Sequence, residues 1–152
     1  MSTEHMTATD PEIHEPKNIT TASNNQVYVA DGASSGNWTS RQIVLNTRID
    51  DVSTAASYWV VTPFAGSVSS IYTVIDGAIG TADATITFEL SGTAITDGTI
   101  TIANASSAAG DVDSSSPTAN NVVSAGQAIE VITDGASTGT VSAVVTIVID
   151  LS

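Results

Sequence analysis

The sequence predicts an all-β protein, an antiparallel β-sandwich of jelly-roll type with about eight strands. It contains 16 Val and 15 Ile against 3 Leu, and side chains branched at Cβ suit a pleated surface better than a helix. It also contains 22 Thr and 20 Ser, which supply neutral hydroxyl groups for the outward strand faces. Asp-Gly pairs at residues 31, 76, 97 and 134 fall between apolar runs, where turns are expected.

We expect three parts along the chain. Residues 1–25 are polar, contain two prolines and show no sustained period, so they are interpreted as an extended N-terminal arm that orders only on a partner. Residues 26–50 are expected to join the arm to the body through short strands at Gln26–Ala30 and Arg41–Asn46, with a glycine loop between them. Residues 51–152 are expected to form the β-sandwich domain.

The strands of the body follow from apolar alternation. Ala84–Leu90 alternates cleanly between apolar and polar residues, which is typical of a half-buried strand. The other strands expected on the same grounds are Tyr58–Val61, Ser67–Ile75, Ala128–Thr133 and Val141–Asp150.

Two segments of the body are assigned from turn and loop signals. Thr93–Thr96 and Thr99–Ala103 flank Asp97-Gly98, which predicts a hairpin with a type I′ turn. The Ser- and Ala-rich segment Asn104–Asn121 is predicted to be a long loop, and Thr47–Ala56 a connector.

The formal net charge of −13 is unevenly distributed. Residues 49–152 contain eleven acidic residues and no basic one, while Lys17, Arg41 and Arg48 are the three basic residues of the chain. Such acidity argues against direct binding of nucleic acid or of an anionic membrane, and no run of about 18 apolar residues indicates a membrane span. If the body self-associates, the contact should be apolar or rich in hydroxyl groups, with the acids at its periphery.

The residues with catalytic potential do not form a recognisable set. Both histidines, His5 and His14, lie in the expected arm, where an imidazole is not held for general-base catalysis. Glu89 and Glu130 are the only glutamates of the body and resemble a glycosidase pair in type, but Glu89 alternates outward like an ordinary solvent-facing residue. We therefore predict that the protein is not an enzyme and needs no cofactor.

The metal-site signals are equally weak. The chain has no Cys. Asp111-Val112-Asp113 resembles the start of a calcium loop, but the sixth and twelfth places of that pattern hold Ser116 and Val122 instead of Gly and Glu. The segment is therefore interpreted as a solvated acidic loop, and no metal site is predicted.

The aromatic pair Tyr58-Trp59 allows two interpretations, because adjacent strand residues face opposite ways. One residue of the pair would then provide an exposed platform for a carbohydrate. Alternatively, Trp59 packs in the core and Tyr58 lines an interface, which we favour because so large a side chain usually dominates core or interface burial.

Several segments resemble the head decoration (cement) or head-fibre type of tailed-phage virion protein. They are IHEPK at residues 13–17, QVYVADGASSGNW at 26–38, VVTPFAG at 60–66, GQAIEV at 126–131 and DGASTGT at 134–140. The resemblance implies a trimeric β-sandwich that stands on the outer capsid surface and is anchored partly through its N-terminal segment.

From this resemblance we expect a non-enzymatic capsid decoration protein, made in the host cytoplasm, that stabilises the head by bridging capsid subunits. Its expected partners are the major capsid protein and further copies of itself in a homotrimer. The expected capsid-binding residues are Ile13, His14, Glu15, Pro16, Lys17, Ile19, Trp38, Arg41 and Arg48. The alternative is a receptor- or glycan-binding module of a phage tail fibre or head fibre, with the sugar at Tyr58 and Trp59.

Overall fold

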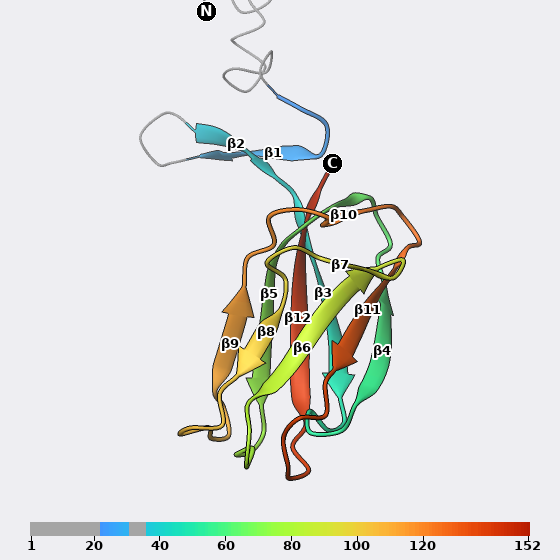
Figure 1. Cartoon of the computed structure of the whole chain (residues 1–152). Coiled ribbons are helices and arrows are strands. Elements are labelled where there is room, and N and C mark those ends of the chain that lie inside the picture. Colours follow the sequence, from blue (N-terminus) through green and yellow to red (C-terminus); the bar gives the residue numbers. More distant parts are fainter. Residues whose placement is uncertain (1–21, 31–35) are drawn as a thin grey trace, which may run out of the picture. The chain divides into compact units, whose positions relative to one another are not determined.

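The computed structural model describes residues 22–30 and 36–152, and the chain divides into two compact units, residues 1–41 and 42–152 (Figure 1). The first unit contains the antiparallel hairpin of β1 (Gln26–Ala30) and β2 (Gly36–Ser40). The strands of the second unit are β3 (Gln42–Ile49), β4 (Ala56–Val61), β5 (Gly66–Ile75), β6 (Ala84–Leu90), β7 (Thr93–Ala94), β8 (Ile100–Ile102), β9 (Val112–Ser115), β10 (Val122–Val123), β11 (Ala128–Thr133) and β12 (Ala143–Leu151). Nothing among the described residues forms a helix that could cross a membrane.

The second unit is a sandwich of two antiparallel sheets, which confirms the predicted fold class. In the first sheet, here called the β12 sheet, β9 and β10 share one edge of β5, followed by β12 and β3. In the second, the β11 sheet, the order is β4, β11 and β6, and β7 and β8 share the far edge of β6. If each split edge counts as one strand, the two sheets have the strand order of a jelly roll, and consecutive strands lie in opposite sheets except for β6 and the β7/β8 edge, which are neighbours in one sheet.

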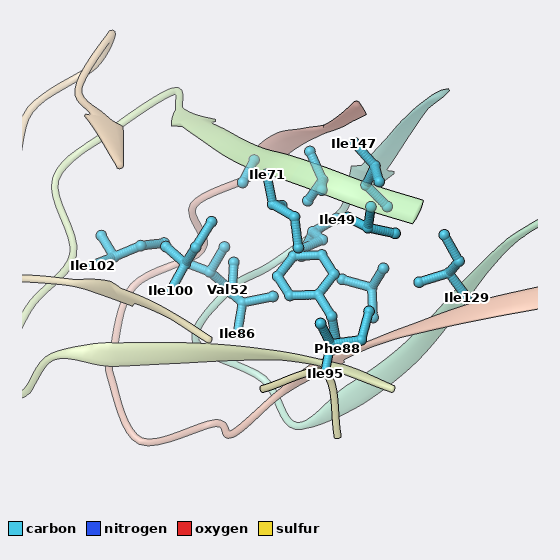
Figure 2. Close-up of a cluster of buried hydrophobic side chains, with 14 of the residues drawn as sticks. Ile49, Val52, Ile71, Ile86, Phe88, Ile95, Ile100, Ile102, Ile129 and Ile147 are labelled. Atoms are coloured by element: carbon cyan, nitrogen blue, oxygen red, sulfur yellow. The ribbon is translucent and has the colours of Figure 1, made fainter. Parts of the chain in front are cut away.

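The core lies between the two sheets, and strict alternation along the central strands builds it. In β6 and β12 every second residue is buried, so one face of each strand enters the core and the other faces outward. Phe88 and a set of isoleucines fill the centre (Figure 2). Each fully buried side chain of this size contributes about 1.5–3 kcal/mol of hydrophobic stabilisation.

The sandwich begins earlier in the chain than the expected boundary at residue 51. β3 pairs with β12 from Gln42 to Ile49, and Ile49 is fully buried. The expected joining segment 26–50 therefore contributes eight residues near its end, Gln42–Ile49, to the β12 sheet. The expected connector Thr47–Ala56 also contains a core residue, Val52, because the corner between β3 and β4 turns inward.

The predicted hairpin around Asp97-Gly98 is wrong. β7 and β8 do not pair with each other; both pair with β6, as two short pieces of one split edge. Asp97 has a positive φ of 57° but Gly98 does not, so the turn is not of type I′. The buried side chain of Ile95 holds the intervening segment against the core, and this burial decides the path of the chain.

The predicted loop Asn104–Asn121 also differs, because it contains β9. Val112 to Ser115 pair with Val74 to Ile71 of β5. The segment has only one apolar residue, and that residue is exposed, so its strand character comes from backbone pairing with β5 and not from an apolar pattern.

Candidate functional surfaces

The hairpin unit contains the first candidate surface. Tyr28 and Trp38 are directly opposite each other, with ring centroids 5.3 Å apart and an interplanar angle of 64°, an edge-to-face arrangement. Val27 and Val29 lie on the other face of the hairpin and are exposed. None of the described residues of this unit is buried. Because a two-stranded hairpin alone is marginally stable in water, it gains stability when a partner surface covers these side chains.

The expected capsid-binding residues fall into three groups. Ile13, His14, Glu15, Pro16, Lys17 and Ile19 lie outside the described residues. Trp38 and Arg41 lie in the hairpin unit, where the backbone N–H of Arg41 donates to the carbonyl of Asn25 at 2.8 Å. Arg48 belongs to β3 of the sandwich, and so to the other unit.

Arg48 is held by acids and a hydroxyl group of its own sandwich. Its Nη2 donates to the hydroxyl of Ser142 at 2.6 Å and lies 3.8 Å from a carboxylate oxygen of Asp76, and its Nε lies 3.9 Å from Asp50. The hydroxyl and backbone N–H of Ser142 donate to Asp76, and together with Arg48 they lower the pKa of Asp76. This cluster joins β3, the end of β5 and the start of β12.

A second acid fixes the corner after β3. The carboxylate of Asp51 accepts bonds from the backbone N–H of Ser53 at 2.9 Å, the hydroxyl of Thr54 at 2.8 Å and the backbone N–H of Val141 at 3.3 Å. The bond from Ser53 is the largest cause of the lowered pKa of Asp51. Acids at the ends of the sandwich therefore have local structural partners.

The favoured interpretation of Tyr58-Trp59 is wrong, because their sides are reversed. Trp59 is 60% exposed, while Tyr58 packs against the core and its hydroxyl accepts the backbone N–H of Asp50 at 3.3 Å. β4 ends with a run of apolar and aromatic residues, and its phase is set by pairing with β11, which places Val60 opposite buried Ile129. The exposed platform of the alternative interpretation is thus present as Trp59.

Trp59 begins a row of side chains across the outward face of the β11 sheet. Glu130 is directly opposite Trp59, and Glu89 is directly opposite Glu130. Directly opposed residues have Cβ atoms about 4.5–5.5 Å apart. The row therefore combines an aromatic ring, which can stack on a sugar, with carboxylates that can accept bonds from sugar hydroxyls.

The acidic segment Asp111–Asp113 has a structural setting. Asp113 is directly opposite Thr73, which is buried, so its side chain faces inward along the edge strand β9. Burial, and then the charge of Asp111, raise the pKa of Asp113. No group of three or more His, Cys, Asp or Glu side chains that could hold a metal ion occurs in the described ranges 22–30 and 36–152. An inward charge on an edge strand discourages pairing with another chain.

The outward face of the β12 sheet holds a surface that sequence reasoning missed. It is formed by Val44, Tyr72, Val74, Val112, Val144 and Thr146, and is called the Tyr72 face below. The available signal was a pair of adjacent apolar residues in each central strand, Val74-Ile75 and Val144-Val145, since such pairs place an apolar side chain on both faces.

Comparisons with known proteins assign no function. No family model and no curated protein matches the chain. A solved structure of a Bacillus endospore appendage, from a family of disulfide-linked pili, is 16% identical, with a TM-score of 0.25, and the match covers 74% of this chain and 92% of that chain. This similarity is too low to support an argument.

Proposed function

We propose that this chain is a non-enzymatic bacteriophage capsid decoration protein that binds the outer surface of the assembled head. The single structural observation that supports the proposal is that the chain contains two units of different kinds. One is a sandwich with its own complete core. The other is a hairpin in which no described residue is buried, and whose valines and aromatic rings suit packing on another surface. In this proposal that surface is the major capsid protein, the partner that the resemblance of the sequence to phage decoration proteins implies.

In this proposal stabilisation arises by bridging. Each copy contacts capsid subunits through its N-terminal segment, and copies joined in a homotrimer link several subunits. Expansion of the shell then has to break those contacts as well as the contacts of the shell itself. Because the arms of one trimer bind together, modest affinity for each arm is sufficient.

Deleting residues 1–25 is expected to leave a folded β body that no longer decorates capsids. The sandwich should remain folded because all of its core residues lie between Ile49 and Leu151. The measurement is cosedimentation with capsids assembled without this protein, with far-UV circular dichroism as the test of folding. We expect the bound fraction to fall at least tenfold.

Two tryptophan substitutions in the full-length chain complement this deletion, one as a test of the hairpin and the other as its control. Trp38→Ala removes the edge-to-face contact with Tyr28 in the hairpin and should weaken capsid binding. Trp59→Ala removes an exposed side chain from the sandwich and should leave capsid binding unchanged. Undiminished binding by the truncated protein would refute the role of the arm.

The exposure of Trp59 favours a second candidate function, a glycan-binding module of a tail fibre or head fibre. Trp59→Ala is then expected to weaken retention on bacterial surface oligosaccharides, displayed on an array, by at least tenfold, because the stacking surface is lost. Phe64→Ala, which removes an exposed aromatic ring outside this row, is the control. If the wild-type protein binds no oligosaccharide, this candidate is excluded, and electron micrographs that place the chain over the shell favour decoration.

A further inference from the structure

The Tyr72 face is an ordered apolar surface of the sandwich. Val144 of β12 is directly opposite Val74 of β5, which is directly opposite Val112 of β9. In the next row Thr146 is opposite Tyr72. The six residues Tyr72, Thr73, Val74, Val112, Val144 and Thr146 line a shallow hollow of about 240 Å³. Val112 is 62% exposed and Val44 55% exposed, so large apolar side chains face solvent in the isolated chain.

Acidic groups are absent from the middle of this face and lie at its two ends. At one end Asp150 accepts a hydrogen bond from the side chain of Gln42 at 2.7 Å. At the other end Asp50 and Asp76 flank Arg48, which is opposite Val144. Between these ends the outward residues of β3, β12, β5 and β9 are apolar, hydroxyl or amide residues.

The outward face of the β11 sheet has the reverse distribution of charge. Glu130 and Glu89 are adjacent in its central row. Two copies that met through that face would bring four carboxylates together with no cation of their own, and like charges across an interface cost several kcal/mol. The chain has a net charge of −13. Of the two sheet faces, only the Tyr72 face allows identical copies to meet without carboxylates of one copy opposing those of the other.

We propose that the Tyr72 face is the contact through which copies of this chain associate. The occupant of the hollow is a second copy. A face with an acid-free apolar centre and acids at its ends is complementary to another face of the same kind, and not to a cationic or strongly acidic partner. This inference deepens the proposed function, since bridging by several arms requires joined copies, and in the proposed homotrimer the Tyr72 faces of the copies would meet around the three-fold axis.

The size of the face is adequate for a specific contact. Four strands at a spacing of about 4.8 Å and a nine-residue central strand at about 3.4 Å per residue give a surface of about 20 by 30 Å. Its planar area is about 600 Å², of the same order as the roughly 800 Å² that each partner buries in a standard interface.

The test is the mass of the full-length protein in solution, measured by sedimentation equilibrium up to about 100 μM. The wild-type chain is expected to have the mass of at least two copies. Val112→Asp combined with Val44→Asp is expected to raise the dissociation constant at least 100-fold, because each change places a charge on an apolar contact that becomes desolvated. Added NaCl should strengthen association of the wild-type chain, since it screens the acids at the ends.

Val61→Asp combined with Thr101→Asp is the matched control, with the same added charge on exposed positions of separate strands of the β11 sheet. It should associate like the wild type, and circular dichroism should show both double variants folded. A wild-type chain that stays monomeric, or a control that dissociates as fully as Val44→Asp with Val112→Asp, would overturn the inference.

Capsid binding separates this inference from the proposed function. A wild-type monomer that still decorates capsids would leave the proposed function standing and remove the interface. An oligomer that dissociates on substitution of Val44 and Val112 but binds no capsid would do the opposite. If both hold, the dissociated variant should bind capsids more weakly than wild type but more strongly than the chain lacking residues 1–25, because single arms remain.

Discussion

Replacing Phe88 by alanine is expected to lower the free energy of unfolding by about 3–5 kcal/mol. Phe88 has no exposed surface and lies at the middle of the core, opposite Val131 of the neighbouring strand (Figure 2). The substitution removes the transfer free energy of the ring and leaves a cavity, because isoleucines on both sheets are held by backbone pairing and cannot close the space. For a domain whose total stability is about 5–15 kcal/mol, the loss is large.

The measurement is urea unfolding followed by far-UV circular dichroism, with Phe64→Ala as the control. Phe64 is the other phenylalanine of the chain and is 56% exposed, so its replacement should cost less than about 1 kcal/mol. If Phe88→Ala does not fold, Phe88→Leu should still show an intermediate loss. Equal losses at positions 64 and 88 would contradict the arrangement of the core.

The strands with one buried face could be predicted from the sequence. Ala84–Leu90 and Ala128–Thr133 have the predicted bounds, because an alternation of period two fixes both the type of the element and its phase. Gln26–Ala30 also has its predicted bounds. In Ala84–Leu90 and Ala128–Thr133 the local pattern and the tertiary burial agree, so the sequence alone is sufficient.

Where apolar residues face both ways, the sequence does not determine which side is buried. Tyr58, Trp59, Val60 and Val61 are consecutive, and their phase depends on cross-strand pairing with β11, which lies about 70 residues away in the chain. The short pieces β7 and β9 were missed or misassigned because they exist through pairing with β6 and β5, and a two- or four-residue strand has no pattern of its own.

The candidate surfaces were predictable only in part. The alternation of Val27, Tyr28 and Val29 is typical of a strand with an apolar face and an aromatic face, and the hairpin has both. For the Tyr72 face, the sequence predicts only the general character of a self-contact, which should be apolar or hydroxyl-rich with acids at its periphery. It does not predict which residues form the face. Its members come from four strands scattered between residues 44 and 146, so only the topology brings them together.

A methyl group at position 66 is expected to destabilise the sandwich by about 2–3 kcal/mol. Gly66 begins β5 and is opposite Leu151, beyond the point at which the register of β5 and β12 shifts between Val148 and Ile149. A Cβ on Gly66 would lie 2.3 Å from the carbonyl oxygen of Asp150 and 2.8 Å from Cγ2 of Ile149. The nearer atom belongs to the backbone, so the clash is relieved only if the end of β12 moves away from β5.

Gly77→Ala is the control for Gly66→Ala, because it adds the same methyl group where there is space. The nearest atom to a Cβ at Gly77 is Cγ2 of Val141 at 3.5 Å, an ordinary van der Waals contact, and the φ of Gly77 is not positive. Its replacement should change stability by less than about 1 kcal/mol and can raise it, since alanine restricts the unfolded chain more than glycine does. If the urea midpoints of the two variants agree within error, β12 passes position 66 at a greater distance and the register shift does not constrain this edge.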